Sequence, residues 1–194
     1  MFAVLFEVEP KTERWDDYLR HAAMLRPELL KIDGFLDNRR FASRRRPGTL
    51  LSLSYWQDEK AVIRWRTHAL HRQVQAAGRE HVFRDYHLRV GEVARDGGIL
   101  QPQTRHHGIS RAASVIEGPT LDDPPGVSGL ADWDRFDGIT VPGSALILLS
   151  WTHGDAMNAW EPAGGERRTD VAIVRDYGMR DRREAPQYFP PVPG

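Results

Sequence analysis

The sequence contains no cysteine, only three lysines and no long apolar run. The lack of cysteine excludes disulfide scaffolds, thiolate zinc sites and cysteine nucleophiles. The longest apolar stretches, at residues 112–116 and 145–149, are much shorter than the roughly 20 residues that a membrane-spanning helix needs. No basic segment precedes the apolar start of the chain, so no secretory signal is visible. The expected compartment is therefore the cytoplasm, without a membrane partner.

An excess of charge of either sign is also lacking, because 27 basic side chains match 27 acidic ones. A neutral chain gives no support for a nucleic-acid or anionic-membrane partner. The basic run at residues 44–46 precedes Pro47-Gly48, which is typical of a charged hairpin tip rather than of an RNA-binding surface. With 40% hydrophobic residues in 194, the chain is long enough to bury a core without disulfides or a structural metal.

The first half predicts the element order βαββαβ, the ferredoxin-like split unit of an α+β fold. Strands are expected at residues 2–9, 35–43, 50–56 and 86–94 from their β-branched, aromatic and alternating composition. A first helix is expected after Thr12 as N-cap, with an apolar stripe up to residue 29. A second helix is expected after Asp58 as N-cap and continues to about Gly78.

The second half resembles a shortened copy of the first. Residues 51–56 end at Trp56, and the next tryptophan is Trp65; residues 146–151 end at Trp151, and the next is Trp160. Both pairs are nine residues apart, and similar sequences, VARD at 93–96 and IVRD at 173–176, follow them in the same order. Three matching elements in one order favour an internal repeat. The second copy is expected to be degenerate, because residues 122–126 (DDPPG) occupy much of the place of its first helix.

These observations predict two units, a linker between them and a tail at the end of the chain. The expected bounds are 1–96 for the first unit, 97–111 for a glycine- and proline-bearing linker, 112–183 for the second unit and 184–194 for a proline-rich tail. Ferredoxin-like sheets leave open edges that must be covered. Together with the aromatic residues of the tail, this leads us to expect a homodimer.

The residues 54–61 (SYWQDEKA), then Trp65, then 68–72 (HALHR), with Gly34-Phe35 before the second strand, resemble the antibiotic biosynthesis monooxygenase family. The resemblance covers residues 1 to about 96. It implies a dimeric α+β barrel built from ferredoxin-like units, here in tandem within one chain. It also implies oxidation of an aromatic or polyketide-like small molecule by molecular oxygen, without flavin, metal or heme.

The residues suggest a pocket between the second helix and the sheet. Trp65, His68 and Arg72 share one face of that helix, and His71 lies on a neighbouring face. We expect Trp65 to stack on the substrate and His68 to act as the general base. The alternative is that Trp65 is a plain core residue and that His68 hydrogen-bonds to a neighbouring loop; the repeat, which keeps Trp160 without the two histidines, favours a packing role for Trp65.

The cofactor-free members of the family imply further pocket groups. Asn38 and Arg40 alternate onto one face of the second strand, where both can address a developing oxyanion. Whether that face lines the pocket or solvent stays open at this stage. Tyr86, His71 and Arg72 are the remaining candidates for substrate contacts.

Two other functional classes stay open. One is a non-catalytic barrel that binds a small molecule. The other, less favoured, is heme binding or degradation, because the heme-degrading relatives carry an Asn on the first strand and a His about ten residues after the helix tryptophan. This chain has no Asn in its first strand, and Gln75 stands ten residues after Trp65. Metal binding at His106-His107 lacks a third ligand at suitable spacing, and no serine-hydrolase or nucleotide-binding motif is present.

Overall fold

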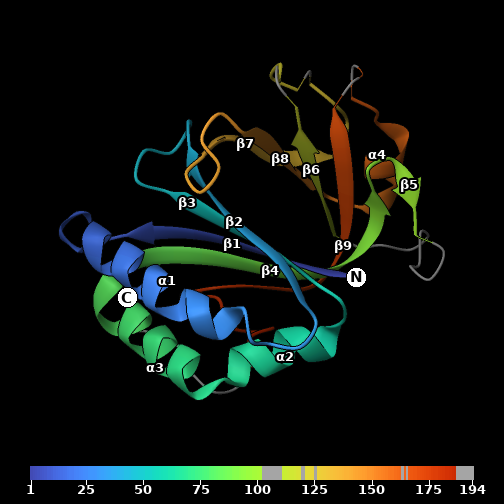
Figure 1. Cartoon of the computed structure of the whole chain (residues 1–194). Helices are drawn as coiled ribbons and strands as arrows, with labels where there is room; N and C mark the ends of the chain where they lie inside the picture. The colour runs from blue at the N-terminus through green and yellow to red at the C-terminus, as the bar shows by residue number, and fades with distance from the viewer. Residues whose placement is uncertain (102–110, 119–120, 125, 163, 165, 187–194) are drawn as a thin grey trace.

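The computed structural model describes residues 1–101, 111–118, 121–124, 126–162, 164 and 166–186. Most of the expected linker, with His106-His107, and most of the expected tail lie outside these residues. The predicted α+β class is confirmed, and the described part of the chain forms strands around an apolar interior with helices on the outside (Figure 1).

The first half has the predicted βαββαβ order. Its elements are β1 (Phe2–Pro10), a 3-10 turn (Thr12–Arg14), α1 (Trp15–Leu29), β2 (Phe35–Ser43), β3 (Leu50–Trp56), α2 (Glu59–Thr67), α3 (Ala69–Ala77), a π-helical turn (Gly78–Val82) and β4 (Phe83–Asp96). Asp58 caps α2 as predicted, because its Oδ1 accepts a hydrogen bond from the Ala61 amide at 2.8 Å.

Two local predictions in this half are wrong. Thr12 is not the cap of the first helix: it opens a 3-10 turn, and α1 begins three residues later, at Trp15. The second helix is not continuous, because the backbone of His68 is extended (φ −57°, ψ 131°) and separates α2 from α3. The two helices therefore meet at an angle instead of sharing one straight apolar stripe.

The second half is shorter. It contains β6 (Ala112–Glu117), β7 (Leu130–Gly138), β8 (Ala145–Trp151), α4 (Gly154–Ala159) and β9 (Arg167–Gly178), while the two-residue β5 (Ile99–Leu100) lies between the halves. The described residues between β6 and β7 contain no helix. Among its residues, the sequence DDPPG at 122–126 opposes helix formation, as the sequence predicts.

The strands close into a barrel within one chain. Their order is β1-β3-β2-β7-β8-β6-β9-β4, and β4 returns to pair with β1, every pair being antiparallel. Each half contributes its strands in the order fourth, first, third, second, and the halves meet at β2–β7 and β4–β9. Internal closure removes the open edges on which the expectation of a homodimer partly rested, so the oligomeric state stays a prediction.

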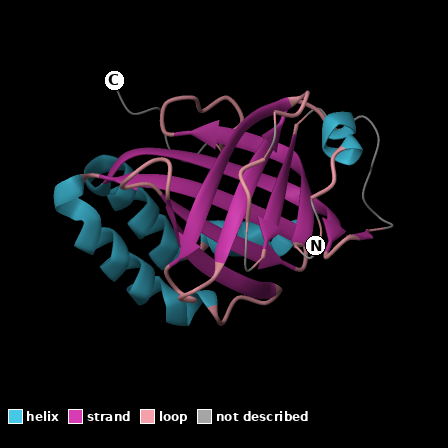
Figure 2. Cartoon of the chain, turned by 90° about the horizontal axis from the view of Figure 1, so that it is seen from above, coloured by secondary structure: helices cyan, strands magenta, loops and turns pink. Residues whose placement is uncertain are grey.

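The barrel interior is filled by side chains from both halves. Leu5, Phe41 and Leu53 of the first half pack with Phe136 and Leu146 of the second, all at most 1% exposed. The helices cover the outside: α1, α2 and α3 lie together over the first half, and α4 lies on the opposite side (Figures 1 and 2). No helix among the described residues is both long enough and apolar enough to cross a membrane.

Candidate active site

The main cavity of the described residues lies between the helices of the first half and the outer face of its sheet. Its volume is about 230 Å³. For comparison, an engineered apolar cavity of about 150 Å³ holds benzene. The space therefore suits a molecule of one or two rings better than a large polycyclic one.

The floor of the cavity consists of two rows of side chains that run across five strands. The row nearer α2 contains Asn38, Ser54, Val4, Val90 and Arg175, and the other contains Arg40, Ser52, Phe6, Leu88 and Tyr177. Each row follows paired positions of β2, β3, β1, β4 and β9, so all ten side chains lie on the outer face. The floor is polar on β2 and β3, apolar on β1, and phenolic and cationic where β9 reaches it.

Asn38 and Arg40 both line the cavity, which answers the question that the sequence left open. The Asn38 amide group donates to Ser52 Oγ at 2.9 Å and to the Leu53 carbonyl oxygen at 3.2 Å. A carbonyl can only accept, so these contacts fix the amide orientation and leave Asn38 Oδ1 as a buried acceptor without a partner in the described chain. In this orientation Asn38 offers an acceptor, not the donor that an oxyanion needs.

Arg40 keeps its role as a possible donor. Its guanidinium lies beside the buried phenol of Tyr18 on α1. Burial raises the pKa of Tyr18, and the neighbouring Arg40 charge partly opposes that shift. The Tyr18 phenol is therefore a hydrogen-bond donor at the cavity wall at neutral pH, beside the Arg40 guanidinium.

The roof of the cavity contains a stacked pair of rings at the break between α2 and α3. Trp65 stacks on His71 with the ring centroids 4.1 Å apart and the planes 16° apart. His71 Nδ1 lies 2.8 Å from the Trp65 carbonyl oxygen. Because that oxygen can only accept, Nδ1 carries the hydrogen and Nε2 is left as the acceptor. The break at His68 accompanies this contact, since it sets α3 at an angle to the end of α2 (Figure 1).

The His71 ring is held in its neutral form. Burial lowers the pKa of His71 to about 4, although the hydrogen bond to the Trp65 carbonyl acts in the opposite direction. Gln75 Nε2 lies 3.5 Å from His71 Nε2, within hydrogen-bond distance of that acceptor nitrogen. A neutral imidazole at the cavity wall can take a proton from a bound molecule, and a pKa near 4 makes it a weaker base than a solvated histidine.

His68 is not one of the described residues that line the cavity, although Trp65, His71, Arg72 and Tyr86 are. Its ring stacks on Trp65 at 5.7 Å, on the side toward α1, and its Nε2 lies 3.8 Å from Glu28 Oε2. The prediction assumed one continuous helix, on which His68 follows Trp65 on the same face. The extended backbone at His68 breaks that relation and brings His71 to the cavity instead.

The sequence did not indicate three cavity residues near the predicted Tyr86, namely Arg79, Arg182 and Tyr177. Tyr86 Oη accepts hydrogen bonds from Arg79 Nη1 at 2.7 Å and from Arg182 Nη1 at 2.5 Å. Arg182 and Tyr177 come from the second half, which reaches the site only because β9 pairs with β4. No local pattern in the sequence indicates that pairing, although a run of arginines near the end of the chain is visible.

The cavity is strongly basic. Seven arginines line it: Arg26, Arg40, Arg66, Arg72, Arg79, Arg175 and Arg182. Neither aspartate nor glutamate is found among the described residues of its wall. Arg175 reaches outward to an ion pair with Glu59. The remaining surface is largely aliphatic and aromatic, so the cavity fits an apolar molecule and favours negative charge within it.

The matching region of the second half contains packed side chains. Trp151 and Trp160 lie with ring centroids 5.8 Å apart and pack with Leu121, Val127 and Met157. The Arg168 guanidinium donates to the carbonyl oxygens of Trp160 and Met157. These contacts fill the side of the barrel on which α4 lies. The two matching tryptophans therefore differ in their surroundings: Trp65 lines the cavity, whereas Trp160 packs within a cluster of side chains.

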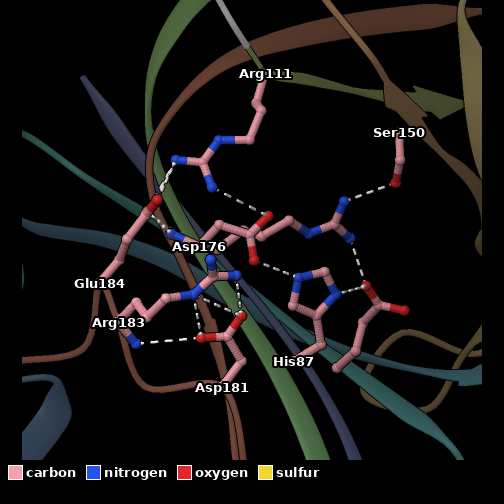
Figure 3. Close-up of polar contacts among 9 residues, drawn as sticks. His87, Arg111, Ser150, Asp176, Asp181, Arg183 and Glu184 are labelled. Atoms are coloured by element: carbon pink, nitrogen blue, oxygen red, sulfur yellow. Dashed lines mark hydrogen bonds and ion pairs between the residues drawn. The ribbon is translucent and has the colours of Figure 1, made fainter.

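A second polar cluster lies on the barrel outside the cavity and is drawn in Figure 3. His87 Nε2 lies 2.6 Å from Asp176 Oδ1, and Arg111 pairs with Glu184 at 2.8 Å. Glu184 also accepts a hydrogen bond from the Asp176 backbone amide at 2.8 Å. These charges pair with each other and fix the segment after β9 to the sheet. Among the described residues, no group of three or more histidine, aspartate or glutamate side chains is arranged to hold a metal ion.

Comparison with known proteins gives three findings. The sequence profile of the antibiotic biosynthesis monooxygenase family matches residues 1–77. A protein of Pyricularia oryzae named jasmonate monooxygenase ABM is 39% identical over 221 aligned positions, which cover 99% of this chain and 100% of that protein. Among solved structures, an aldoxime dehydratase in complex with butyraldoxime has a TM-score of 0.55 at 9% identity, covers 89% of this chain and 79% of its own, and is similar in fold alone. A putative monooxygenase from Lactobacillus acidophilus has a TM-score of 0.45 at 7% identity, with 90% and 94% of the two chains covered.

Proposed function

The chain belongs to the antibiotic biosynthesis monooxygenase family, and from that premise we propose that it oxidises a small, largely apolar carbon acid with molecular oxygen in the cavity under α1, α2 and α3. The observation that carries the proposal is His71, a neutral imidazole in the cavity wall whose Nε2 carries no hydrogen and can accept a proton when its 3.5 Å contact with Gln75 Nε2 is given up. The basic and otherwise apolar walls support binding of a molecule that becomes an anion during the reaction.

The proposed reaction begins with removal of a proton from an acidic CH₂ group by His71 Nε2. The resulting carbanion transfers electrons to O₂, and a carbon–oxygen bond forms to give a peroxide. The peroxide then loses water as its O–O bond breaks and the carbon becomes a carbonyl. In total, CH₂ and O₂ give C=O and H₂O, so the substrate supplies all the electrons. For this reason we propose that no flavin, metal or heme takes part.

The surrounding residues have distinct tasks in this proposal. The Trp65 indole, stacked on His71, forms a wall on which a flat substrate packs. Arg40 and the Tyr18 phenol beside it are donors for the negative charge that develops on the substrate. Asn38 contributes an acceptor through Oδ1, which suits a substrate hydroxyl group. His68, which lies outside the cavity wall, has no task in the chemistry.

The test is oxygen consumption by the purified protein against quinols, naphthols, small anthrones and jasmonate, the compound in the name of the relative. Each is assayed without additives and again with NADPH and flavin. With ¹⁸O₂ the product is expected to carry one labelled oxygen and to have lost two hydrogens. His71→Gln is expected to lower the rate by about 10²–10⁴-fold, whereas His68→Gln, a matched change at the other histidine that stacks on Trp65, should change it by less than about threefold.

Four outcomes contradict the proposal. Equal rates for wild type and His71→Gln would exclude His71 as the base. Turnover only with NADPH and flavin would show that the substrate does not supply the electrons. Binding of several compounds without consumption of any would favour the alternative, a non-catalytic binding protein. A Soret band in the purified protein would favour the heme alternative.

The assembly and location stay predictions. A homodimer is expected to give about twice the chain mass of 22.1 kDa in light scattering, and a concentration-independent monomer mass would exclude it. Because the barrel closes within one chain, a monomer would leave the proposed chemistry unchanged.

A further inference from the structure

The Tyr86 phenol lies between two guanidinium groups at one end of the cavity. Arg79 and Arg182 both donate to its oxygen, at 2.7 and 2.5 Å. A phenol oxygen has two acceptor sites, and these two contacts occupy both. The phenol hydrogen is therefore directed away from the two arginines and is available to a third group.

The charge of Arg182 is not balanced by any described carboxylate of the cavity wall. Arg182 lines the cavity, its Nε is buried without a partner in the described chain, and no described carboxylate lines the same space. Burial, followed by the charge of Arg79, lowers the pKa of Arg182, with only the Tyr86 and Tyr177 phenols acting in the other direction. A half-buried cation under these conditions gains from an added anion.

The position of Arg182 is fixed from outside the cavity. The segment that carries it follows β9 and is held by the polar cluster of Figure 3, in which Glu184 accepts from Arg111 and from the Asp176 amide. Arg182 Nη1 also lies 3.3 Å from the Gly178 carbonyl oxygen, a second anchor on its own segment. Part of the entropy of ordering this side chain is thus already lost before a ligand binds, which favours binding.

We propose that Arg79, Arg182 and Tyr86 form a subsite for a carboxylate, so that the substrate is a small apolar carboxylic acid. The proposal rests on the proposed function for the identity of the cavity as the substrate site. The carboxylate accepts from Arg182, from Arg79 and from the Tyr86 hydroxyl, and neutralises the charge of Arg182.

This subsite also fixes the direction in which the substrate lies. Tyr86 packs with Val8, Tyr18 and Tyr177, whereas Trp65 packs near Leu29 and Trp56, so the two groups are at opposite ends of the cavity. Between them the floor offers the apolar side chains of Val4, Phe6, Leu88 and Val90. A bound acid therefore has its carboxylate at Tyr86, its apolar part along β1 and β4, and its reacting carbon beside His71.

The test compares acids with their own methyl esters, which keep the carbon skeleton and remove the charge. Jasmonate and cyclohexylacetate, each with its methyl ester, are titrated calorimetrically into the wild-type protein under argon, where no oxidation takes place. Each acid is expected to bind about 10- to 100-fold more tightly than its ester, the range for hydrogen bonds to a charged group. An ester that binds as tightly as its acid, or a protein that binds neither, overturns the proposal.

Variants locate the effect. Arg182→Gln and Tyr86→Phe are each expected to weaken acid binding about tenfold or more and to leave ester binding within about twofold. Arg180→Gln is the matched control: Arg180 is two residues away, 63% exposed and paired with Asp85 at 3.2 Å. Arg180→Gln should change neither acid binding nor ester binding. If Arg182→Gln, folded by circular dichroism, binds the acid like the wild type, the carboxylate does not bind at this subsite.

The same measurements separate this proposal from the proposed function. Acid-selective binding without oxidation in air would support the carboxylate subsite and contradict the monooxygenase activity. Oxidation in air with no preference for the acid would support the monooxygenase activity and contradict the subsite.

Discussion

The neutral, buried state of His71 makes a specific prediction about stability against pH. In the folded protein burial lowers the pKa of His71 to about 4, from its usual value of 6.5. Between these two values the unfolded chain binds a proton at this residue and the folded chain does not. By linkage, the free energy of unfolding then decreases as the pH falls from about 6.5 to 4, and the loss is complete at the folded pKa.

The size of the effect follows from the shift. A difference of about 2.5 pKa units corresponds to about 3 kcal/mol, of which about 2 kcal/mol is lost between pH 7 and pH 5. His71 keeps part of its surface exposed, so 2 kcal/mol is an upper figure for that interval. It is still a large part of the total stability of an ordinary domain, about 5–15 kcal/mol.

The assay is urea unfolding of the wild type and of His71→Gln at pH 7 and pH 5. Between pH 7 and pH 5 the free energy of unfolding of the wild type is expected to fall by up to about 2 kcal/mol more than that of the variant, because Gln does not titrate. His81→Gln is the matched control, since His81 is 70% exposed. The free energy of unfolding of His81→Gln should fall by as much as that of the wild type. Equal losses for the wild type and His71→Gln would refute the argument that burial holds this imidazole neutral.

Four further predictions follow from the geometry. The acid limb of kcat/KM is expected to have a pKa near 4, the value for His71, and a limb near 6.5 would indicate a solvated base. Phe41→Ala, in the barrel interior, should reduce the free energy of unfolding by about 3–5 kcal/mol in urea titrations. Asp58→Ala should cost about 1 kcal/mol in the same assay, because it removes the α2 cap. Gly91→Ala should destabilise by about 1–3 kcal/mol, since the added Cβ would lie 2.4 Å from the Ala172 carbonyl oxygen where β4 and β9 pair; an unchanged midpoint would show that the two strands separate readily.

The fold class could be predicted because its signals are local. Alternation in β2 and β3, the Asp58 cap and the turn at Pro47-Gly48 each act over a few residues and agree with one another. The closure of the barrel was not predictable in this way, because it depends on the pairing of β2 with β7 and of β4 with β9, which are far apart in the sequence.

The site could be predicted in part. Trp65, Asn38, Arg40 and Tyr86 all line the cavity, since an alternating strand and a helix face are visible in the sequence. His71 lines the cavity in place of His68 because the helix breaks at His68, and no proline or glycine in the sequence marks that break. The break is accompanied by a hydrogen bond from the His71 ring to the Trp65 carbonyl, a contact without a sequence signature. Arg182 depended on long-range strand pairing and was missed for that reason.

The most direct measurement of the central claim separates proton removal from the oxygen step. A substrate found in the oxygen-uptake panel is incubated with the protein in D₂O under argon, and deuterium at its acidic carbon is followed by NMR. If His71 is the base, the wild type exchanges that hydrogen with solvent although no product forms, and His71→Gln does so about 10²–10⁴-fold more slowly. Equally fast exchange in both proteins, or none in the wild type, would contradict the account.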